Sequence, residues 1–213
     1  MIEIQDFKVF SLHNFDQIPQ LKKHLTSQQY RAIQVVGTVL PFKVNNYVID
    51  ELINWDDVPN DPIFILTFPQ KDMLEDEHYQ LVDQALENDI PQVELKKIVN
   101  KIRADLNPNP AGQLDHNVPI LDGERLNGVQ HKYDQTLLFF PSHGQTCHAY
   151  CTFCFRWPQF IGDKNLKFAQ NETQQVIEYI KRHPKITDIL FTGGDPMKMN
   201  AARLRAYLEP FLG

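Results

Sequence analysis

Apolar side chains in the first hundred residues recur at intervals of three and four positions, which places them along one face of a helix. This spacing predicts helices over residues 28–39, 46–53, 70–88 and 92–106. Residues 63–68 form a short run that is almost entirely apolar, and the propensity of its residues favours a strand. We therefore expect the first part of the chain to be mainly helical.

The pattern changes near residue 110, after a segment whose prolines and glycine cannot continue a helix. Beyond it, residues 136–140 and 186–191 are short apolar runs with the character of buried strands. A helical pattern follows each run, over residues 171–183 and 200–211. This order of elements predicts parallel strands joined by a helical crossover.

The two patterns predict two regions, a mainly helical one over residues 1–110 and a second one over residues 111–213. Because the second region alternates strands and helices, the predicted fold class is α/β. Ligand-binding loops in such sheets follow the carboxyl ends of the strands. A cysteine-rich loop and a Gly-Gly-Asp-Pro turn stand at those two ends. We expect both to lie at the same edge of the sheet.

The composition excludes several classes of protein. The chain has 213 residues, of which 42% are hydrophobic and 23% charged, so a packed core is expected. A formal charge of −6 argues against general electrostatic binding to nucleic acid or to an anionic membrane surface. The sequence has neither a run of about 18 apolar residues nor a secretory signal. We therefore expect a cytoplasmic protein with no nucleic-acid or membrane partner.

The three cysteines of the chain are grouped as Cys147-x3-Cys151-x2-Cys154. An odd, clustered set of cysteines without an export signal fits a metal site in a reducing compartment better than a disulfide framework. Three thiolates can hold three irons of a four-iron cluster and leave the fourth iron open to a ligand. The spacing therefore points to chemistry at a metal centre.

Two other interpretations of the cysteines stay open. Zinc would be bound in a tetrahedron if His143 or His148 completed the three thiolates. Structural zinc sites usually use paired C-x2-C segments, and this chain has no second pair. Inert buried thiols are the third interpretation. On ligand geometry we favour an iron–sulfur cluster, and we assign no role to His148.

The glycine turn begins directly after the second predicted strand. Gly193 and Gly194 allow a backbone to approach a ligand closely or to turn with a positive φ. Asp195 and the nearby carbonyls can accept hydrogen bonds from an ammonium group. Many such turns have no further role. This one is informative because it follows the cysteine loop by a single crossover.

In this order, the two motifs resemble the radical S-adenosylmethionine (SAM) superfamily and, more narrowly, the lysine 2,3-aminomutase family. The resemblance covers residues 50–213, and it is looser before the cysteines. The segments that carry it are Asp61-Pro62-Ile63, Pro69-Gln70, His131-Lys132-Tyr133, the cysteine loop with Arg156, and Thr192-Gly193-Gly194-Asp195-Pro196.

The resemblance implies an isomerase with a 4Fe-4S cluster bound to Cys147, Cys151 and Cys154. SAM would bind the open iron through its amino and carboxylate groups. An electron delivered by a reducing partner would cleave SAM to a 5′-deoxyadenosyl radical. That radical would take a hydrogen from a small amino-acid substrate and so permit a 1,2-amino migration.

The resemblance also implies roles for single residues. Phe153 occupies the position that packs near the adenine of SAM. Gly193, Gly194 and Asp195 would contact the amino end of its methionine. Arg156 matches an arginine that pairs with the substrate carboxylate, a role that suits a planar guanidinium. An ordinary ion pair is the plainer alternative for Arg156.

In this family pyridoxal phosphate (PLP) carries the migrating amino group. Lys132 matches an arginine near the PLP phosphate, and Gln135 replaces a second arginine and removes a charge. No lysine among residues 1–213 matches the one that forms the imine with PLP. A radical SAM enzyme that works without PLP is therefore an open alternative, and the substrate is not identified.

The fold implied by the resemblance is a partial (β/α) barrel with several more strand–helix units, and a full eight-unit barrel takes about 250 residues. We therefore expect an amino-terminal fragment, the truncated start of such a barrel behind a helical region. Two parallel strands alone are a poor independent fold. An alternative of a different class is a non-catalytic metal-binding or interaction module. An oligomer is compatible with the sequence.

Overall fold

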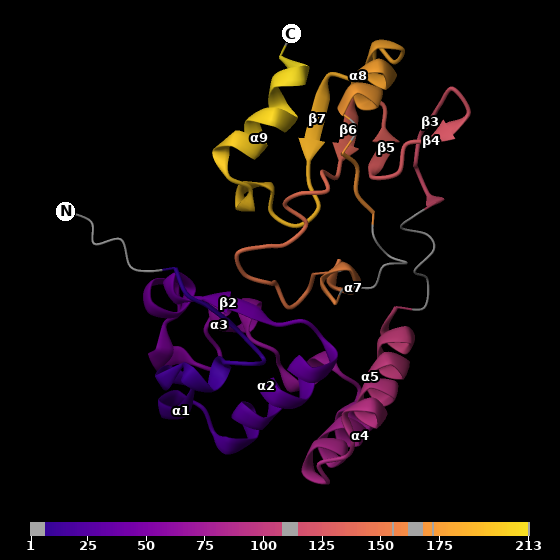
Figure 1. Cartoon of the computed structure of the whole chain (residues 1–213). Coiled ribbons are helices and arrows are strands. Elements are labelled where there is room, and N and C mark those ends of the chain that lie inside the picture. The colour runs from indigo at the N-terminus through magenta and orange to yellow at the C-terminus, as the bar shows by residue number, and fades with distance from the viewer. Residues whose placement is uncertain (1–6, 108–114, 155, 162–167, 172, 213) are drawn as a thin grey trace, which may run out of the picture. The chain divides into compact units, whose positions relative to one another are not determined.

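The computed structural model describes residues 7–107, 115–154, 156–161, 168–171 and 173–212 (Figure 1). The chain divides into two compact units, each made of two segments. Unit 1 comprises Met1–Pro108 and His148–Trp157, and unit 2 comprises Asn109–Cys147 and Pro158–Gly213. The boundary predicted near residue 110 lies outside the described residues.

Helices make up most of the described part of unit 1. The α-helices are α1 (Pro19–His24), α2 (Ser27–Val39), α3 (Pro62–Thr67), α4 (Asp76–Glu87) and α5 (Gln92–Leu106). Helices α2 and α5 confirm the predictions for those segments. The helix predicted over residues 70–88 is divided into a 3-10 turn at Lys71–Met73 and α4. The helix predicted over residues 46–53 contains a π-helix at Val48–Leu52. None of the described helices is long and apolar enough to cross a membrane.

The strand predicted over residues 63–68 is wrong, because this run forms α3. The backbone amide of Phe64 donates a hydrogen bond of 2.7 Å to Oδ1 of Asp61, and Pro62 occupies the first helical position. An aspartate cap followed by proline is a strong helix start, since the cap satisfies an unpaired amide and proline needs no partner. This local signal outweighs the strand propensity of the apolar run.

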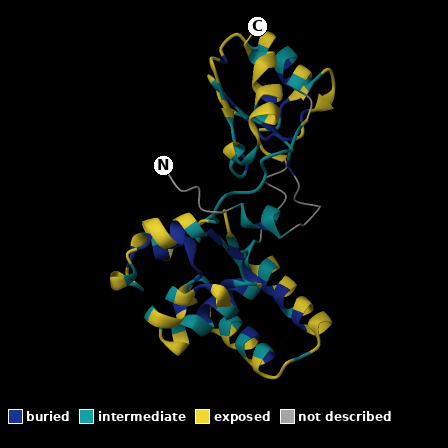
Figure 2. Cartoon of the chain, turned by 60° about the vertical axis from the view of Figure 1, so that its left-hand side comes forward, coloured by how far each residue is buried: buried dark blue, intermediate teal, exposed yellow. Residues whose placement is uncertain are grey.

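Two hydrophobic cores fill unit 1, and α2 contributes to both. Figure 2 shows the buried residues of the chain in dark blue. Ile33 lies in the first core, whereas Val35 and Val36 lie in the second. The first core is rich in aromatic rings, and Phe64 stacks on Phe68 with ring centroids 4.9 Å apart. The second core joins α2 to α4 and α5. A short antiparallel pair, β1 (Val9–Ser11) and β2 (Lys43–Asn45), completes the unit.

Unit 2 is built on a three-stranded sheet with the order β5-β6-β7. The strands are β5 (Val129–Tyr133), β6 (Thr136–Phe139) and β7 (Asp188–Phe191). β5 and β6 are antiparallel, while β6 and β7 are parallel, with Thr136 opposite Asp188 and Phe139 opposite Phe191. The predicted parallel pair is thus confirmed, and helix α8 (Thr173–Lys181) lies in its connection. The class is α/β, with sheets of two and three strands among the described residues.

Helices α8 and α9 (Ala201–Leu208) pack in one core with the sheet of unit 2. Leu137 and Phe139 of β6 point to this core and are fully buried. The Tyr207 ring of α9 lies 5.9 Å from the Phe139 ring, centroid to centroid. Burial of these side chains against the helices is what holds β6 and β7 at their observed register.

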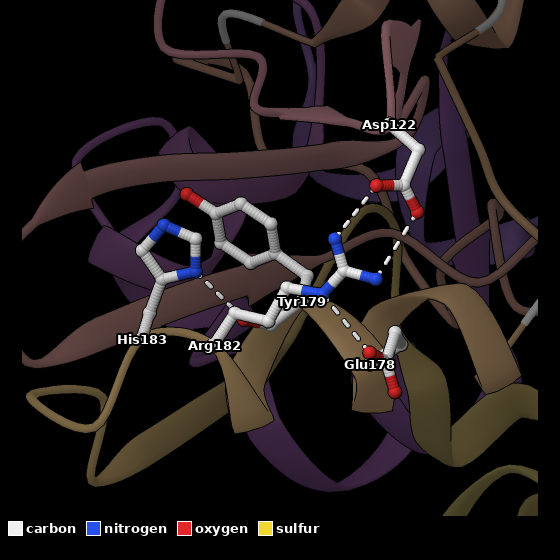
Figure 3. Close-up of polar contacts among 5 residues, drawn as sticks. All are labelled: Asp122, Glu178, Tyr179, Arg182 and His183. Carbon is white, nitrogen blue, oxygen red and sulfur yellow. Dashed lines mark hydrogen bonds and ion pairs between the residues drawn. The ribbon is translucent and has the colours of Figure 1, made fainter.

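A hairpin of β3 (Ile120–Leu121) and β4 (Glu124–Arg125) is tied to the end of α8 by Arg182 (Figure 3). The guanidinium donates hydrogen bonds of 2.7 and 3.1 Å to the two carboxylate oxygens of Asp122. It also donates a bond of 2.9 Å to Oε1 of Glu178. These bonds lower the pKa of Asp122 and raise the pKa of Arg182. The contact is solvent-exposed, so its contribution to the free energy of unfolding is small at physiological salt.

Candidate metal and SAM site

The part of the cysteine loop that follows Cys147 docks on unit 1. The backbone amide of Tyr150 donates a hydrogen bond of 2.8 Å to the carbonyl oxygen of Lys43 at the start of β2. The Lys43 ammonium in turn lies 5.2 Å from the centroid of the Tyr150 ring. Ala149 packs against the first core of unit 1. The residues directly before Cys151 are therefore fixed to the body of the unit.

The end of α3 holds the residue that follows Cys151. The last carbonyls of a helix have no partner within the helix. Thr152 satisfies two of them: its amide donates to the oxygen of Leu66 at 2.8 Å, and its hydroxyl donates to the oxygen of Ile65 at 2.8 Å. Both bonds exist only because residues 62–67 are helical. The helix end thus anchors the loop between Cys151 and Cys154.

A pocket of about 290 Å³ opens beside these two cysteines within unit 1. Both cysteines form part of its wall, together with apolar and aromatic side chains. The lining residues are Leu40, Pro41, Phe42, Thr67, Pro69, Met73, Leu106, Tyr150, Cys151, Thr152, Phe153, Cys154 and Trp157. Apolar side chains beside thiol ligands help to tune a metal centre, although Cys151 itself is exposed here.

Cys151 and Cys154 are brought together by a tight turn. The amide of Cys154 donates a hydrogen bond of 3.0 Å to the carbonyl oxygen of Cys151. Burial raises the pKa of the Cys151 thiol, and the nearby charge of Cys154 raises it further. Two thiolates that repel each other in this way are stabilised by a metal cation. The donor chemistry of the turn therefore fits iron bound by thiolates.

Cys147 lies at the edge of unit 2, directly after a contact with the glycine turn. The amide of Asp195 donates a hydrogen bond of 2.9 Å to the carbonyl oxygen of Thr146. This bond confirms that the cysteine loop and the glycine turn meet at one edge of the sheet. The Asp195 carboxylate accepts a bond of 2.9 Å from the amide of Met197, which starts a 3-10 turn at Pro196–Lys198.

The cysteines of the motif are divided between the two units. Within the ranges that the structure describes, no three His, Cys, Asp or Glu side chains are arranged to hold a metal ion. Cys147 belongs to unit 2, whereas the other two cysteines belong to unit 1. Nδ1 of His143 lies 2.8 Å from the Tyr207 hydroxyl. The ring of His148 packs edge-on against the ring of Phe7, with the ring centroids 5.7 Å apart.

The other residues singled out from the sequence lie in different places. Phe153 lines the pocket with 79% of its surface exposed. Arg156 is half-buried in unit 1, just before helix α7 (Trp157–Phe160), and is not part of the pocket lining. Lys132 is exposed on β5, with its ammonium 5.4 Å from the Tyr133 ring. Because β5 runs antiparallel to β6, Lys132 lies toward the start of β6, while the cysteine loop follows its end.

Sequence reasoning did not find the anchoring role of Thr152. Its hydrogen bonds depend on a helix more than eighty positions away, which no local pattern reveals. The Asp61-Pro62 pair was the available signal, since it marks the start of that helix. Gln145 was also missed. It lies two residues before Cys147, and its carboxamide donates a bond of 2.5 Å to the carbonyl oxygen of Pro141.

Comparison with protein families gives a match at the segment that contains all three cysteines. Residues 136–211 match the family described as "4Fe-4S single cluster domain". No solved structure is significantly similar to the chain. The family match covers the strand β6, the cysteine loop, the crossover helix and the glycine turn.

Relatives among curated proteins are named as lysine 2,3-aminomutases. An Aquifex aeolicus protein named "Putative L-lysine 2,3-aminomutase" is 27% identical over 88% of this chain and 39% of its own length. L-lysine 2,3-aminomutase of Clostridium subterminale is 26% identical over 87% of this chain and 36% of its own length. The enzyme of Methanococcus maripaludis is 34% identical over 34% of this chain and 16% of its own length.

The chain thus spans less than half of the length of these relatives. These similarities confirm the resemblance to the radical SAM superfamily and to the lysine 2,3-aminomutases that the motifs indicate. They extend over helical unit 1 as well as the cysteine segment, since they cover up to 88% of the chain.

Proposed function

We propose that this chain forms the cluster-binding and SAM-binding part of a radical SAM enzyme that catalyses 1,2-amino migration on an amino acid. The observation that carries the proposal is the turn of Cys151 and Cys154. It presents two adjacent thiols on the wall of a mainly apolar pocket. This turn lies within the segment that matches the 4Fe-4S family.

Cys147, Cys151 and Cys154 hold the cluster in this proposal. When bound, a 4Fe-4S cluster with one open iron supplies the electron for reductive cleavage of SAM. The chain's own residues orient its ligands. Thr152 holds the two later cysteines against the end of α3 through its two hydrogen bonds. The pocket wall places mainly apolar side chains beside the two cysteines, and such surroundings tune an iron–sulfur site.

The glycine turn and Phe153 bind the organic part of SAM. Asp195 is oriented by the hydrogen bond that its carboxylate accepts from Met197. Its charge and the carbonyls of the turn suit an ammonium group, so the amino end of SAM binds there. Phe153 offers an exposed ring at the pocket for stacking on the adenine. Arg156 binds the carboxylate of the substrate, because a guanidinium pairs with it through two hydrogen bonds.

The residues present do not fit PLP well enough to derive a step through it. Lys132 is a single exposed cation on β5 that contacts an aromatic ring. A phosphate site normally combines several donors, such as backbone amides and a guanidinium. The partners proposed are therefore SAM, an amino-acid substrate and a reducing electron donor.

The experiment is an anaerobic assay of SAM cleavage by the reconstituted full chain. With a strong reductant, the proposal predicts 5′-deoxyadenosine and methionine in equal amounts. Cys151→Ala and Cys154→Ala should abolish both products. Lys132→Ala should leave SAM cleavage unchanged, because Lys132 is exposed on β5 and has no part in the proposed cluster or SAM site.

Two results would contradict the proposal. A colourless protein that holds stoichiometric zinc would favour a non-catalytic metal-binding module. Product formation that survives both cysteine substitutions would show that the cleavage does not arise at this loop. Either result is read from metal analysis and chromatography on the same preparations.

A further inference from the structure

We propose that Gly144, Gly193 and Gly194 form a clasp between the cysteine loop and the glycine turn, and that this clasp positions Cys147. In this clasp they act as positioning residues, because they reach Cys147 only through the backbone of the loop. The inference rests on the proposed function, in which Cys147 is a cluster ligand. It gives the two glycines of the turn a second role in addition to the proposed contact with SAM.

The turn contributes two glycines to the clasp. A Cβ atom on Gly194 would lie 2.6 Å from both the nitrogen and the oxygen of Thr146, the residue before Cys147. Backbone atoms cannot move aside as a flexible side chain can. Gly193 has a φ of +132°, and a Cβ there would lie 2.7 Å from Oε1 of Gln145. The space that a side chain would need at Gly194 is thus filled by the backbone of Thr146, and the space at Gly193 by the side chain of Gln145.

The loop contributes the third glycine, and the contact is reciprocal. Gly144 has a φ of +79°, a conformation that side chains disfavour. A Cβ on Gly144 would lie 3.3 Å from the Cα of Pro196 and 3.4 Å from the oxygen of Asp195. Each backbone therefore fits into the space left by a glycine of the other. The close approach of these two segments, within unit 2, therefore requires glycine at the three positions.

Hydrogen bonds fix the clasp to the two parallel strands. The Asp195 amide donates to the oxygen of Thr146 at 2.9 Å. The amide of Thr192 donates to the oxygen of Phe139, also at 2.9 Å, where β6 ends. Both strands lie in one register and share one core, so their ends cannot slide past each other. Thr146 is held by the bond from the Asp195 amide and by close contact with Gly194, and this fixes where the next residue, Cys147, begins.

Helix α9 adds a third connection to the loop. Nδ1 of His143 lies 2.8 Å from the hydroxyl of Tyr207, which is buried in the core of unit 2. The same hydroxyl donates a bond of 3.1 Å to Oδ1 of Asn171. The residues just before Gly144 are thereby tied to the same core. The start of the loop is therefore held by α9, and the glycine contacts of the clasp hold the part that follows.

The test compares Gly194→Ala with two control glycines of unit 2 in the full chain. Gly123 has a φ of +87° and no neighbouring atom within 4 Å of the position that a Cβ would take, so Gly123→Ala introduces backbone strain alone. A Cβ on Gly128 would lie 2.8 Å from the Cα of Ala169, so Gly128→Ala introduces a backbone clash outside the clasp. Gly144→Ala serves as the milder clasp variant if Gly194→Ala does not fold.

The first readout is the iron content per folded chain, with the electron paramagnetic resonance (EPR) spectrum of the reduced cluster. We expect Gly194→Ala and Gly144→Ala to lose iron several-fold and to give the spectrum of Cys147→Ala. Gly128→Ala should melt at a lower temperature but keep the wild-type iron content per folded chain. Gly123→Ala should keep both the iron content and the spectrum.

The second readout needs no cluster. Cys147 is half-buried in the described structure, so opening the clasp in the metal-free chain should speed its alkylation several-fold. The rates at Cys151 and Cys154 should not change. This measurement separates the clasp from the proposed function. If wild-type protein binds no iron but the clasp variants still speed alkylation of Cys147, the function fails and the clasp stands.

Two outcomes overturn the clasp. One is wild-type iron content and wild-type alkylation of Cys147 in both folded clasp variants. The other is an equal loss of iron per folded chain in Gly128→Ala, because the effect would then follow general destabilisation of unit 2.

Discussion

The hydroxyl of Thr152 provides a direct test of how the cysteine loop is anchored. Thr152→Val removes the hydrogen bond of 2.8 Å to the carbonyl oxygen of Ile65 and keeps the branched shape of the side chain. The backbone bond from the same residue to Leu66 is retained. The substitution therefore isolates one anchor beside Cys151 without creating a cavity.

The expected magnitude follows from the setting of this bond. A typical hydrogen bond contributes about 0.5–1.5 kcal/mol to stability. Because the bond is exposed, water replaces the lost donor at the Ile65 carbonyl, and the lower half of this range applies. We expect a loss of about 0.5–1 kcal/mol, which corresponds to about 2- to 5-fold more frequent opening of the loop.

Amide hydrogen exchange of the metal-free chain measures this opening. The amides of Thr152 and Cys154 are both hydrogen-bonded, so their exchange reports when the loop lifts from the helix end. Exchange at both should become about 2- to 5-fold faster in Thr152→Val. Thr152→Ser, which keeps the hydroxyl, should exchange more slowly than Thr152→Val. Equal exchange in wild-type and Thr152→Val would refute the anchor.

Three further predictions concern the scaffold of the site. Asp61→Ala should lower the unfolding free energy by about 1–2 kcal/mol in denaturant titrations, because the amide of Phe64 loses its cap, and Asp61→Asn should restore only part of it, because the second carboxylate oxygen also accepts a hydrogen bond from the amide of Asn54. Leu137→Ala should cost about 2–5 kcal/mol in the same measurement, since this side chain is fully buried in unit 2. The pKa of Asp122 is lowered chiefly by its hydrogen bond from Arg182, so Arg182→Leu should raise it toward the ordinary value in an NMR titration. A lowered carboxyl pKa stabilises the fold above the unfolded-state pKa, and this contribution is lost as the pH falls through the folded-state pKa. An unchanged titration of Asp122, or intact stability in either of the other variants, would contradict the corresponding contact.

Local patterns in the sequence were sufficient for the elements that bury one regular face. Helix α5 agrees with its prediction because Leu95, Val99 and Ile102 recur at helical spacing and are buried on one side. The strands β6 and β7 are short apolar runs, which is what a buried parallel pair requires. The edge shared by the cysteine loop and the glycine turn follows from that pairing.

Other elements depend on local signals that the predictions did not use, or on contacts with residues that are distant in the sequence. β5 reads Val-Gln-His-Lys-Tyr, a polar run with little strand signal, and it is held by pairing with β6. Helix α3 is decided by its cap, which the propensity of its apolar residues conceals. The docking of Thr152 on α3 and of Gly194 on Thr146 joins distant segments. Motif spacing identifies the thiols, and tertiary contacts decide how they are held.

In the proposed function, the cysteine loop binds a 4Fe-4S cluster with an iron open to SAM. The most direct measurement is the EPR spectrum of the anaerobically reconstituted and reduced chain, recorded with and without SAM beside an iron and sulfide analysis. We predict about four irons and four sulfides per chain and a spectrum that changes when SAM is added. Zinc without labile sulfide, or a cluster whose spectrum SAM leaves unchanged, would contradict it.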